Sequence, residues 1–238
     1  MTVALFHTGR PTKYTIDMDA IVGKHLVLIH SPLTATAEGN PLNVPGKINN
    51  ATRLDGYDQY IDLGYHGDSC LGNLMRCRHG FTGSMWAKFR VFLNGMYFLS
   101  SGGGVKIYFL SHSLNFVFTI PGKRWEVKVP APSTDVWHFL EYSWSPEGGL
   151  KVYINNQLLG EDGDPDFAEM EKIRDDSSVR IGYANEGDAE GAPFRSGNFL
   201  VDETEFWFSS RDTLLAFGHL ARGLYGRHRE SGGRGSDL

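Results

Sequence analysis

Short apolar segments with alternating polar positions recur along most of the chain. Between residues 81 and 89, the apolar side chains of Phe81, Met85, Ala87 and Phe89 alternate with polar or amphipathic ones. A period of two is typical of a strand that buries one face and exposes the other. The same alternation, or a short apolar run bounded by turn residues, predicts strands in 21–30, 51–63, 81–93, 96–100, 105–110, 114–120, 125–129, 137–144, 150–154, 157–159, 179–183 and 199–208.

Turn-forming residues separate these segments. Asn94-Gly95 is a strong signal for a two-residue hairpin with 96–100 as its returning strand, and Asn155-Asn156 predicts a second turn. A tight turn over 55–58 divides the segment 51–63 into two strands. The first 20 residues are polar and turn-rich, and the prolines and glycines between 31 and 46 predict a loop.

Helical spacing is rare in this sequence. Apolar residues three apart in 166–175, and the segment 213–221 with Asp212 as its expected N-cap, predict at most two short helices. Many short strands with so little helix predict an all-β fold, an antiparallel β-sandwich of the jelly-roll type with one or two short helices. We expect an N-terminal extension in 1–24, one sandwich domain in 25–226 and a flexible C-terminal tail in 227–238.

Composition and charge narrow the classes of protein. Of the 238 residues, 41% are hydrophobic, which is too many for a disordered chain. No apolar run approaches the roughly 18 residues that a membrane-spanning helix needs, so we expect no membrane insertion by this chain. The net charge of −5 and the scattered lysines and arginines give no basic surface for nucleic acid, which we do not expect as a partner.

The chain has two cysteines, Cys70 and Cys77, which are separated by six residues. Two thiols cannot form a four-ligand zinc site by themselves, and the spacing differs from that of a redox Cys-x-x-Cys pair. A small loop closed by a disulfide is the first interpretation, and two reduced thiols in a cytosolic protein is the alternative. The first ten residues show no secretory signal, so the chain is either cytosolic or a fragment of a secreted or cell-surface parent, and the cysteines favour the extracellular location.

Four segments, taken in order, resemble the laminin-G-like or pentraxin-like members of the concanavalin-A-like lectin and glucanase superfamily. They are a Gly-Lys-x-x-Asn-Ala pattern leading to Asp-Gly and an aromatic-aliphatic strand in 46–64, the Phe-Thr and Trp of 81–86, the hairpin 137–156, and the Asp-Glu strand 199–207. Asn49 and Asn156 stand where the family usually has glycine. The resemblance spans about residues 25 to 225 and implies the sandwich fold. It does not decide the function, because the superfamily contains lectins, adhesion modules, glycosidases and polysaccharide lyases.

Signs of catalysis are weak. A retaining glucanase of this fold would need a Glu-x-Asp-x-x-Glu strand, and none occurs. Strand alternation would place Glu203 and Glu205 on one face, where a solvated outer surface is the simpler interpretation. A serine-nucleophile elbow, a His-Glu-x-x-His motif and a phosphate-binding loop are also missing from the sequence. We therefore expect no enzyme, with an atypical carboxylate pair as an alternative.

An acidic segment is the candidate metal site. Asp162, Asp164 and Asp166 have the spacing that opens an EF-hand loop, although Phe167 and Ile173 then depart from that motif. Many relatives in the superfamily hold calcium at one edge of the sandwich. Calcium is therefore the one cofactor that we consider, with these three aspartates and Asp188 as candidate ligands.

Two further candidates concern glycans. Asn50-Ala51-Thr52 is an N-glycosylation sequon, which is meaningful if the chain is secreted. Trp125, next to Lys123-Arg124 and Glu126, is the candidate exposed platform for stacking a sugar. We expect a non-catalytic extracellular recognition or adhesion module whose edge loops bind a glycan or a protein. A structural component that self-associates is an alternative.

Overall fold

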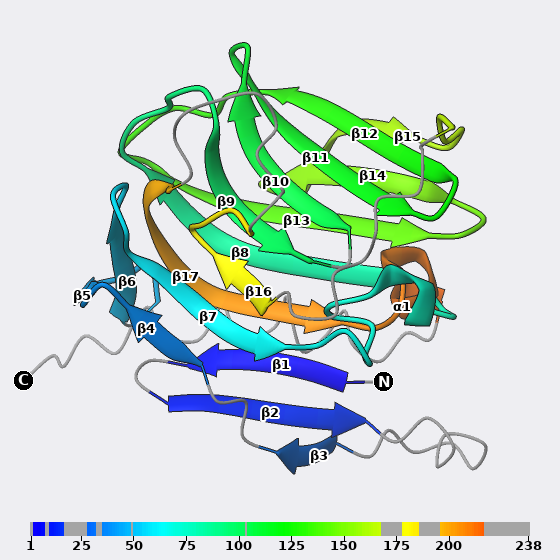
Figure 1. The fold of residues 1–238 in the computed structure, drawn as a ribbon, viewed down its shortest axis with the longest axis horizontal. Helices are drawn as coiled ribbons and strands as arrows, with labels where there is room; N and C mark the ends of the chain where they lie inside the picture. The colour runs from blue at the N-terminus through cyan, green and yellow to red at the C-terminus, as the bar shows by residue number, and fades with distance from the viewer. Residues whose placement is uncertain are drawn as a thin grey trace, which may run out of the picture.

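Two antiparallel sheets lie face to face in the computed structural model (Figure 1). The structure describes residues 2–7, 10–16, 28–31, 35–48, 50–102, 104–167, 178–185 and 196–216. The all-β sandwich expected from the sequence is thereby confirmed. Within the described residues, no helix is long and apolar enough to cross a membrane.

The larger sheet has ten strands. Its order is β15-β14-β13-β8-β17-β1-β2-β3, and β6 joins it by pairing with β17 and with β5. The long strand β17 is central, since it pairs with β8 on one side and with β1 and β6 on the other. The strands are β1 (Thr2–His7), β2 (Arg10–Ile16), β3 (Leu28–Ser31), β5 (Leu42–Pro45), β6 (Asn50–Asp55), β8 (Phe81–Phe89), β13 (Trp137–Ser145), β14 (Gly149–Ile154), β15 (Gln157–Asp162) and β17 (Asn198–Trp207).

The smaller sheet has seven strands in the order β12-β11-β10-β9-β16-β7-β4. Three successive hairpins supply β9 to β12, whereas β16 inserts between β9 and β7 from much later in the chain. The strands are β4 (Thr36–Glu38), β7 (Tyr60–Tyr65), β9 (Met96–Ser101), β10 (Val105–Leu110), β11 (Ser113–Ile120), β12 (Lys123–Pro130) and β16 (Ser178–Ile181).

Aromatic side chains fill the space between the sheets. Tyr142 and Trp144 of β13 and Phe118 of β11 are at most 1% exposed. Phe81 of β8 lies among them, with ring centroids 6.2 Å from Phe118 and 6.3 Å from Tyr142. Alternation along each strand sends these residues inward, and each fully buried large side chain contributes about 1.5–3 kcal/mol.

Most expected strands are found, and two local expectations are corrected. Asn94-Gly95 forms a turn, but β8 and β9 do not pair with each other, since the chain passes from the larger sheet to the smaller one at this turn. The side chain of Asn94 accepts a hydrogen bond from the backbone N–H of Ser111. The expected loop 31–46 contains the short strands β4 and β5. Within 1–24, where we expect an N-terminal extension, β1 pairs with β17 and β2 pairs with β1, and the domain boundaries stay a prediction.

One helix of the expected two lies within the described residues, namely α1 (Arg211–Ala216). Its cap is Ser210 and not Asp212, since the Ser210 hydroxyl accepts from the backbone N–H of Thr213 at 3.3 Å. Most of the other expected helix (166–175) and the whole expected tail (227–238) lie outside the described residues.

The loop between β7 and β8 is closed by a disulfide between Cys70 and Cys77, as the sequence predicted. Both cysteines are buried and belong to the core cluster. Between them, the 3-10 helix η2 (Leu74–Arg76) begins after Asn73, whose side chain accepts from the backbone N–H of Met75 at 3.0 Å. The disulfide, the cap and the buried Leu74 fix this loop to the sandwich.

The turn between β14 and β15 gives a first testable prediction. Asn155 and Asn156 have φ of 52° and 67°, the left-handed pair that a two-residue hairpin needs. Asn156→Val is expected to lower the free energy of unfolding by about 1–2 kcal/mol, because a β-branched residue is disfavoured in this conformation. Asn156→Gly should match or slightly exceed the wild type. Urea unfolding measures both, and equal midpoints for the Val and Gly variants would contradict this turn geometry.

Candidate functional site

A polar row crosses the outer face of the seven-stranded sheet, the face turned away from the core. Residues directly opposite one another on paired strands share a face, so the strand registers define the row. Arg180 of β16 lies opposite both Asp62 of β7 and Ser100 of β9. From strand β4 to strand β12 the row reads Thr36, Asp62, Arg180, Ser100, Lys106, Val117 and Glu126.

The centre of this row is closed to solvent. Ser100 is 0% and Lys106 2% exposed. The side-chain amide of Asn185 donates to the Ser100 carbonyl and hydroxyl, at 3.1 and 2.9 Å, and to the Ser178 carbonyl at 2.7 Å. Buried polar groups that bond one another in this way hold the strands in position and leave little capacity for a ligand. An external ligand would therefore meet the row at its ends.

The β7–β16 end of the row carries what we call the tyrosine–arginine cluster: Tyr60, Asp62, Arg180 and Tyr183. The rings of Tyr60 and Tyr183 have centroids 5.0 Å apart and an interplanar angle of 35°. The Arg180 guanidinium lies 5.2 Å from the Tyr60 ring centroid, and its Nε donates to the Asp62 carboxylate at 3.4 Å. The side chains of Arg180 and Asp62 are 26% and 19% exposed. All four side chains are thus held in place and reach solvent.

Backbone contacts fix this cluster. Tyr183 forms an isolated bridge with Ser196, and the Gly197 N–H donates to the Gly182 carbonyl at 2.8 Å. Gly182 has φ of 90°, and a Cβ there would collide with the side chain of Leu54. Only glycine fits this position, which turns the chain so that Tyr183 comes to lie against Tyr60.

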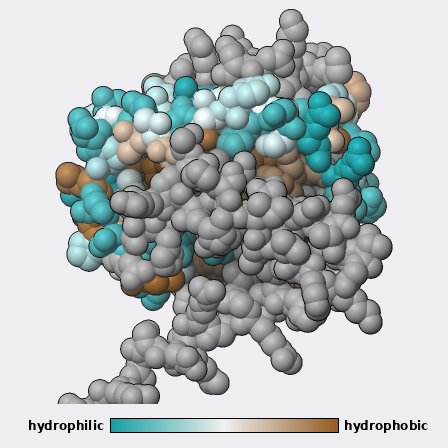
Figure 2. Space-filling model, turned by 90° about the horizontal axis from the view of Figure 1, so that it is seen from below, coloured by the Kyte–Doolittle hydropathy of each residue, from teal (hydrophilic) through white to brown (hydrophobic). Residues whose placement is uncertain are grey.

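The cluster combines apolar ring faces with fixed donors and acceptors. Tyrosine rings offer flat apolar surfaces with a hydroxyl at one end, the guanidinium offers donors in a rigid fork, and the carboxylate offers acceptors. Such a set suits a ligand with C–H faces and several hydroxyl groups. On the face drawn in Figure 2, the brown areas among the coloured residues are small and separate.

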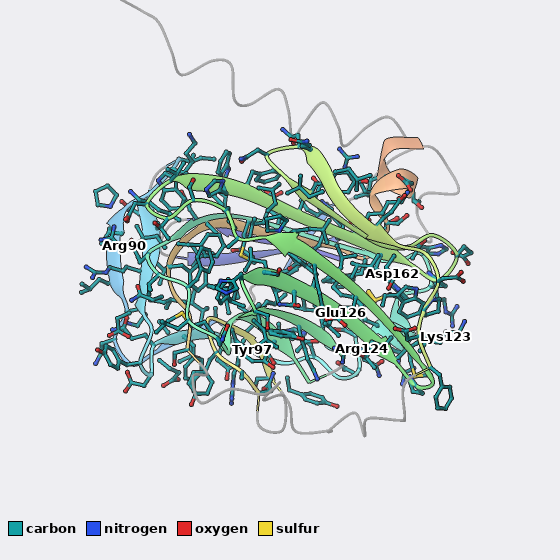
Figure 3. All side chains as sticks on the ribbon, turned by 90° about the horizontal axis from the view of Figure 1, so that it is seen from above. Arg90, Tyr97, Lys123, Arg124, Glu126 and Asp162 are labelled. Carbon is teal, nitrogen blue, oxygen red and sulfur yellow. A yellow bond between two sulfur atoms is a disulfide. The ribbon has the colours of Figure 1, made fainter. Side chains whose placement is uncertain are left out.

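The β12 end of the row is tied to the acidic segment. Figure 3 shows Arg124 and Glu126 on β12 with Asp162 beside them. The two carboxylate oxygens of Asp162 accept from the backbone N–H groups of Glu126, at 2.8 Å, and Asp164, at 3.2 Å. Asp166 pairs through its backbone with Arg124. This segment therefore closes the edge of the sandwich.

The calcium prediction stays open. Asp188 lies outside the described residues. In the parts of the chain that the structure describes, no group of three or more histidine, cysteine, aspartate or glutamate side chains is placed to hold a metal ion. Asp162 already uses both oxygens in the fold, so calcium at Asp162, Asp164 and Asp166 would need backbone oxygens in addition.

The expectation that Trp125 is an exposed platform is wrong. Trp125 is 1% exposed and lies in the core, with its ring centroid 5.3 Å from that of Trp144 in an edge-to-face contact. Alternation along β12 explains the error, because the charged neighbours Arg124 and Glu126 point to the opposite face. Charges next to a residue in sequence therefore do not indicate that the residue is exposed.

The expected Glu203 and Glu205 pair is also corrected. A bulge in β17 lies between Asp202 and Glu205, and Glu203 has a left-handed φ of 45°. As a result Asp202 and Glu205, opposite Trp86 and Ser84, share the outer face of the larger sheet. The Asp202 carboxylate accepts from the backbone N–H groups of the β5–β6 turn, at residues 47 and 48, so its role is to hold that turn.

Asn50 begins β6 and is exposed, opposite Pro45 in the β5–β6 pair. Its glycosylation stays a prediction. The tyrosine–arginine cluster was not expected from the sequence, although alternation in β7 and β16 could have identified Tyr60, Asp62 and Arg180 as outward residues. What the sequence does not display is the pairing of those two strands.

Comparison with known proteins supports the fold. No protein-family model and no curated protein matches this chain. A structure of botulinum neurotoxin type C, from work on its cell entry through two ganglioside molecules, matches with a TM-score of 0.57 at 14% identity over 92% of this chain and 50% of that chain. The binding domain of Paraclostridial Mosquitocidal Protein 1 matches with a TM-score of 0.58 at 12% identity, over 90% and 51%.

A third match is domain 4 of AbnA, a GH43 extracellular arabinanase from Geobacillus stearothermophilus, in complex with arabinotriose. It has a TM-score of 0.52 at 19% identity and covers 76% of this chain and 84% of that one. The chain thus spans about half the length of the two toxin structures and most of the arabinanase domain. At these identities the likeness shows the fold, a β-sandwich that these proteins also contain.

Proposed function

We propose that this chain is a non-catalytic, laminin-G-like recognition module that binds a glycan through the tyrosine–arginine cluster. The single observation that carries the proposal is the geometry of that cluster: two half-buried tyrosine rings 5.0 Å apart next to a fixed Arg180–Asp62 pair. A sugar ring stacks its C–H face on a tyrosine, while its hydroxyl groups bond to the guanidinium and the carboxylate.

The compared structures support this choice of ligand without deciding it. The type C neurotoxin is linked to gangliosides, and the structure of the arabinanase domain is a complex with arabinotriose. Only half of the neurotoxin chain is matched, so its ganglioside contacts need not lie on this fold. An extracellular setting is part of the proposal, supported by the Cys70–Cys77 disulfide.

The test is a broad glycan array with and without calcium, followed by calorimetry on any glycan that binds. Tyr183→Ala and Arg180→Ala are expected to weaken binding about tenfold or more, because each removes a stacking surface or a charged hydrogen-bond donor. Tyr60→Phe should retain most of the affinity, since it keeps the ring. Thermal unfolding of each variant separates lost binding from lost folding.

The matched control is Phe167→Ala, which removes an aromatic side chain that is 86% exposed and outside the cluster. It should leave glycan affinity unchanged. Equal losses in Phe167→Ala and Tyr183→Ala would contradict the proposed site, and an array without any binding would favour a protein ligand. The calcium arm tests the acidic segment, where a melting temperature that is the same in calcium and in chelator would count against a calcium site.

A further inference from the structure

The disulfide loop has an exposed side that glycan binding at the cluster does not use. We call Met75, Arg76, Arg78 and His79 the basic tip. All four residues are exposed, and Met75 has 59% of its surface free. In Figure 1 the loop between β7 and β8 lies beside α1, and the His79 carbonyl accepts from the backbone of Ser210 at 2.8 Å.

The tip is rigid because its inner side is buried. Leu71, Leu74 and the two cysteines are at most 5% exposed and pack in the core. Backbone hydrogen bonds from Cys77 to Leu74 and from residue 80 to Cys77, at 2.9 and 3.1 Å, complete the loop. A surface fixed in this way loses little conformational entropy on binding.

The two arginines of the tip lie close together on one loop. Arg90, Arg124, Arg180 and Arg211 each form an ion pair with a carboxylate of this chain. Within the described ranges, the structure shows no such pair for Arg53, Arg76 or Arg78. Asp68 is the one carboxylate of the loop 65–80. Arg76 and Arg78, two residues apart on this loop, therefore concentrate positive charge at a point that suits an anionic partner.

An apolar side chain stands next to these charges. Met75 adjoins Arg76 on the same turn, and Tyr65, at the start of the same loop, is 51% exposed with its ring over Gly67. Cations alone would suit any polyanion. Cations beside an exposed methionine and tyrosine suit a surface that offers phosphate groups above an apolar layer.

We propose that the basic tip docks this protein on an anionic lipid surface. Arg76 and Arg78 bind lipid phosphates through their guanidinium forks, and Met75 enters the boundary between headgroups and acyl chains. This contact is independent of the tyrosine–arginine cluster, and the protein remains on the membrane surface.

The test is co-sedimentation of the disulfide-bonded protein with vesicles. One set contains equal parts of phosphatidylcholine and phosphatidylglycerol, and the other contains phosphatidylcholine alone. The wild type should bind the anionic vesicles, release them at high salt and ignore the neutral ones. The double variant Arg76→Ala, Arg78→Ala should partition about 30-fold less, since each basic residue contributes about 1 kcal/mol at such a surface. Met75→Ser should also weaken binding to the anionic vesicles. Because it removes no charge, it should leave the salt dependence of binding unchanged.

Arg53→Ala is the matched control, because Arg53 is also exposed, on β6, outside the tip. It and Tyr183→Ala should bind vesicles as the wild type does. Equal binding by the wild type and the double variant would overturn the proposal, as would equal binding to both kinds of vesicle. Retention on heparin-agarose without binding to anionic vesicles would also overturn it, in favour of a polyanionic glycan. Unchanged melting temperatures ensure that each comparison concerns folded protein.

Discussion

Replacing Trp125 with alanine is expected to lower the free energy of unfolding by about 3–5 kcal/mol, the usual cost of emptying a core site of this size. Trp125 is 1% exposed, and its ring meets Trp144 edge to face. Such a loss is a large part of the stability of an ordinary domain. Urea unfolding, followed by the fluorescence of the remaining tryptophans, measures it.

Two controls separate packing from binding. Trp125→Phe keeps most of the apolar volume and loses no hydrogen bond, because the indole N–H has no acceptor in the described part of the chain, so its cost should stay below about 1.5 kcal/mol. Trp86→Ala, at a half-buried site beside Lys47 and Phe139, should cost less than Trp125→Ala. A Trp125→Ala variant with wild-type stability and impaired glycan binding would restore Trp125 as a ligand contact.

Replacing Arg211 with alanine is expected to cost about 2–4 kcal/mol at neutral pH, because it leaves the carboxylate of Glu141 buried without its partner. Arg211 pairs with Glu141, whose side chain is 12% exposed, and lies 4.2 Å from the ring centroid of Tyr153. Burial raises the pKa of Glu141 above its ordinary value, and Arg211 acts in the opposite direction. The pair attaches the start of α1 to the larger sheet.

The pH dependence has a definite sign. A raised pKa in the folded state means that folding favours the protonated form, so ionisation of Glu141 costs stability as the pH rises through that range. Without Arg211 the pKa of Glu141 rises further, and this cost grows. The difference between Arg211→Ala and the wild type should therefore be largest at neutral pH and shrink as the pH falls below the ordinary pKa of glutamate. Unfolding curves at several pH values measure it.

Lys151→Ala is the matched control for Arg211. Lys151 also binds α1, through Asp212 at 2.7 Å, but Asp212 is 62% exposed and the pair should contribute less than about 1 kcal/mol. Any change of its loss with pH in the acidic range is limited to this smaller contribution, whereas that of Arg211→Ala should be larger. Equal, pH-independent losses in both variants would show that Glu141 is not the group responsible.

Local signals in the sequence predicted the strands well and their partners poorly. The ranges expected for β10 and β11 agree with the structure to within one residue at each end, because alternation and turns are properties of neighbouring residues. Whether a strand joins one sheet or the other depends on contacts between distant segments. Asn94-Gly95 was correctly identified as a turn, yet the strand after it enters the opposite sheet.

The same limit applies to the candidate site. The disulfide was predictable because its two cysteines are close in sequence. The tyrosine–arginine cluster joins residues of β7 and β16, and the bulge in β17 changes which carboxylates share a face. Neither a long-range strand pair nor a one-residue bulge leaves a local pattern, so both required the structure.

The contact of β12 with the acidic segment that includes Asp162 and Asp166 has a consequence for aggregation. Strands β12 and β15 each lie at an edge of their sheet. The backbone of Arg124 in β12 pairs with that of Asp166, and the carboxylate of Asp162 accepts from the backbone N–H of Glu126. Part of the unpaired edge that would invite another chain to add a strand is occupied from within. At the opposite end of the smaller sheet, β4 has only three residues. Growth of the smaller sheet into a fibre is therefore disfavoured at both ends.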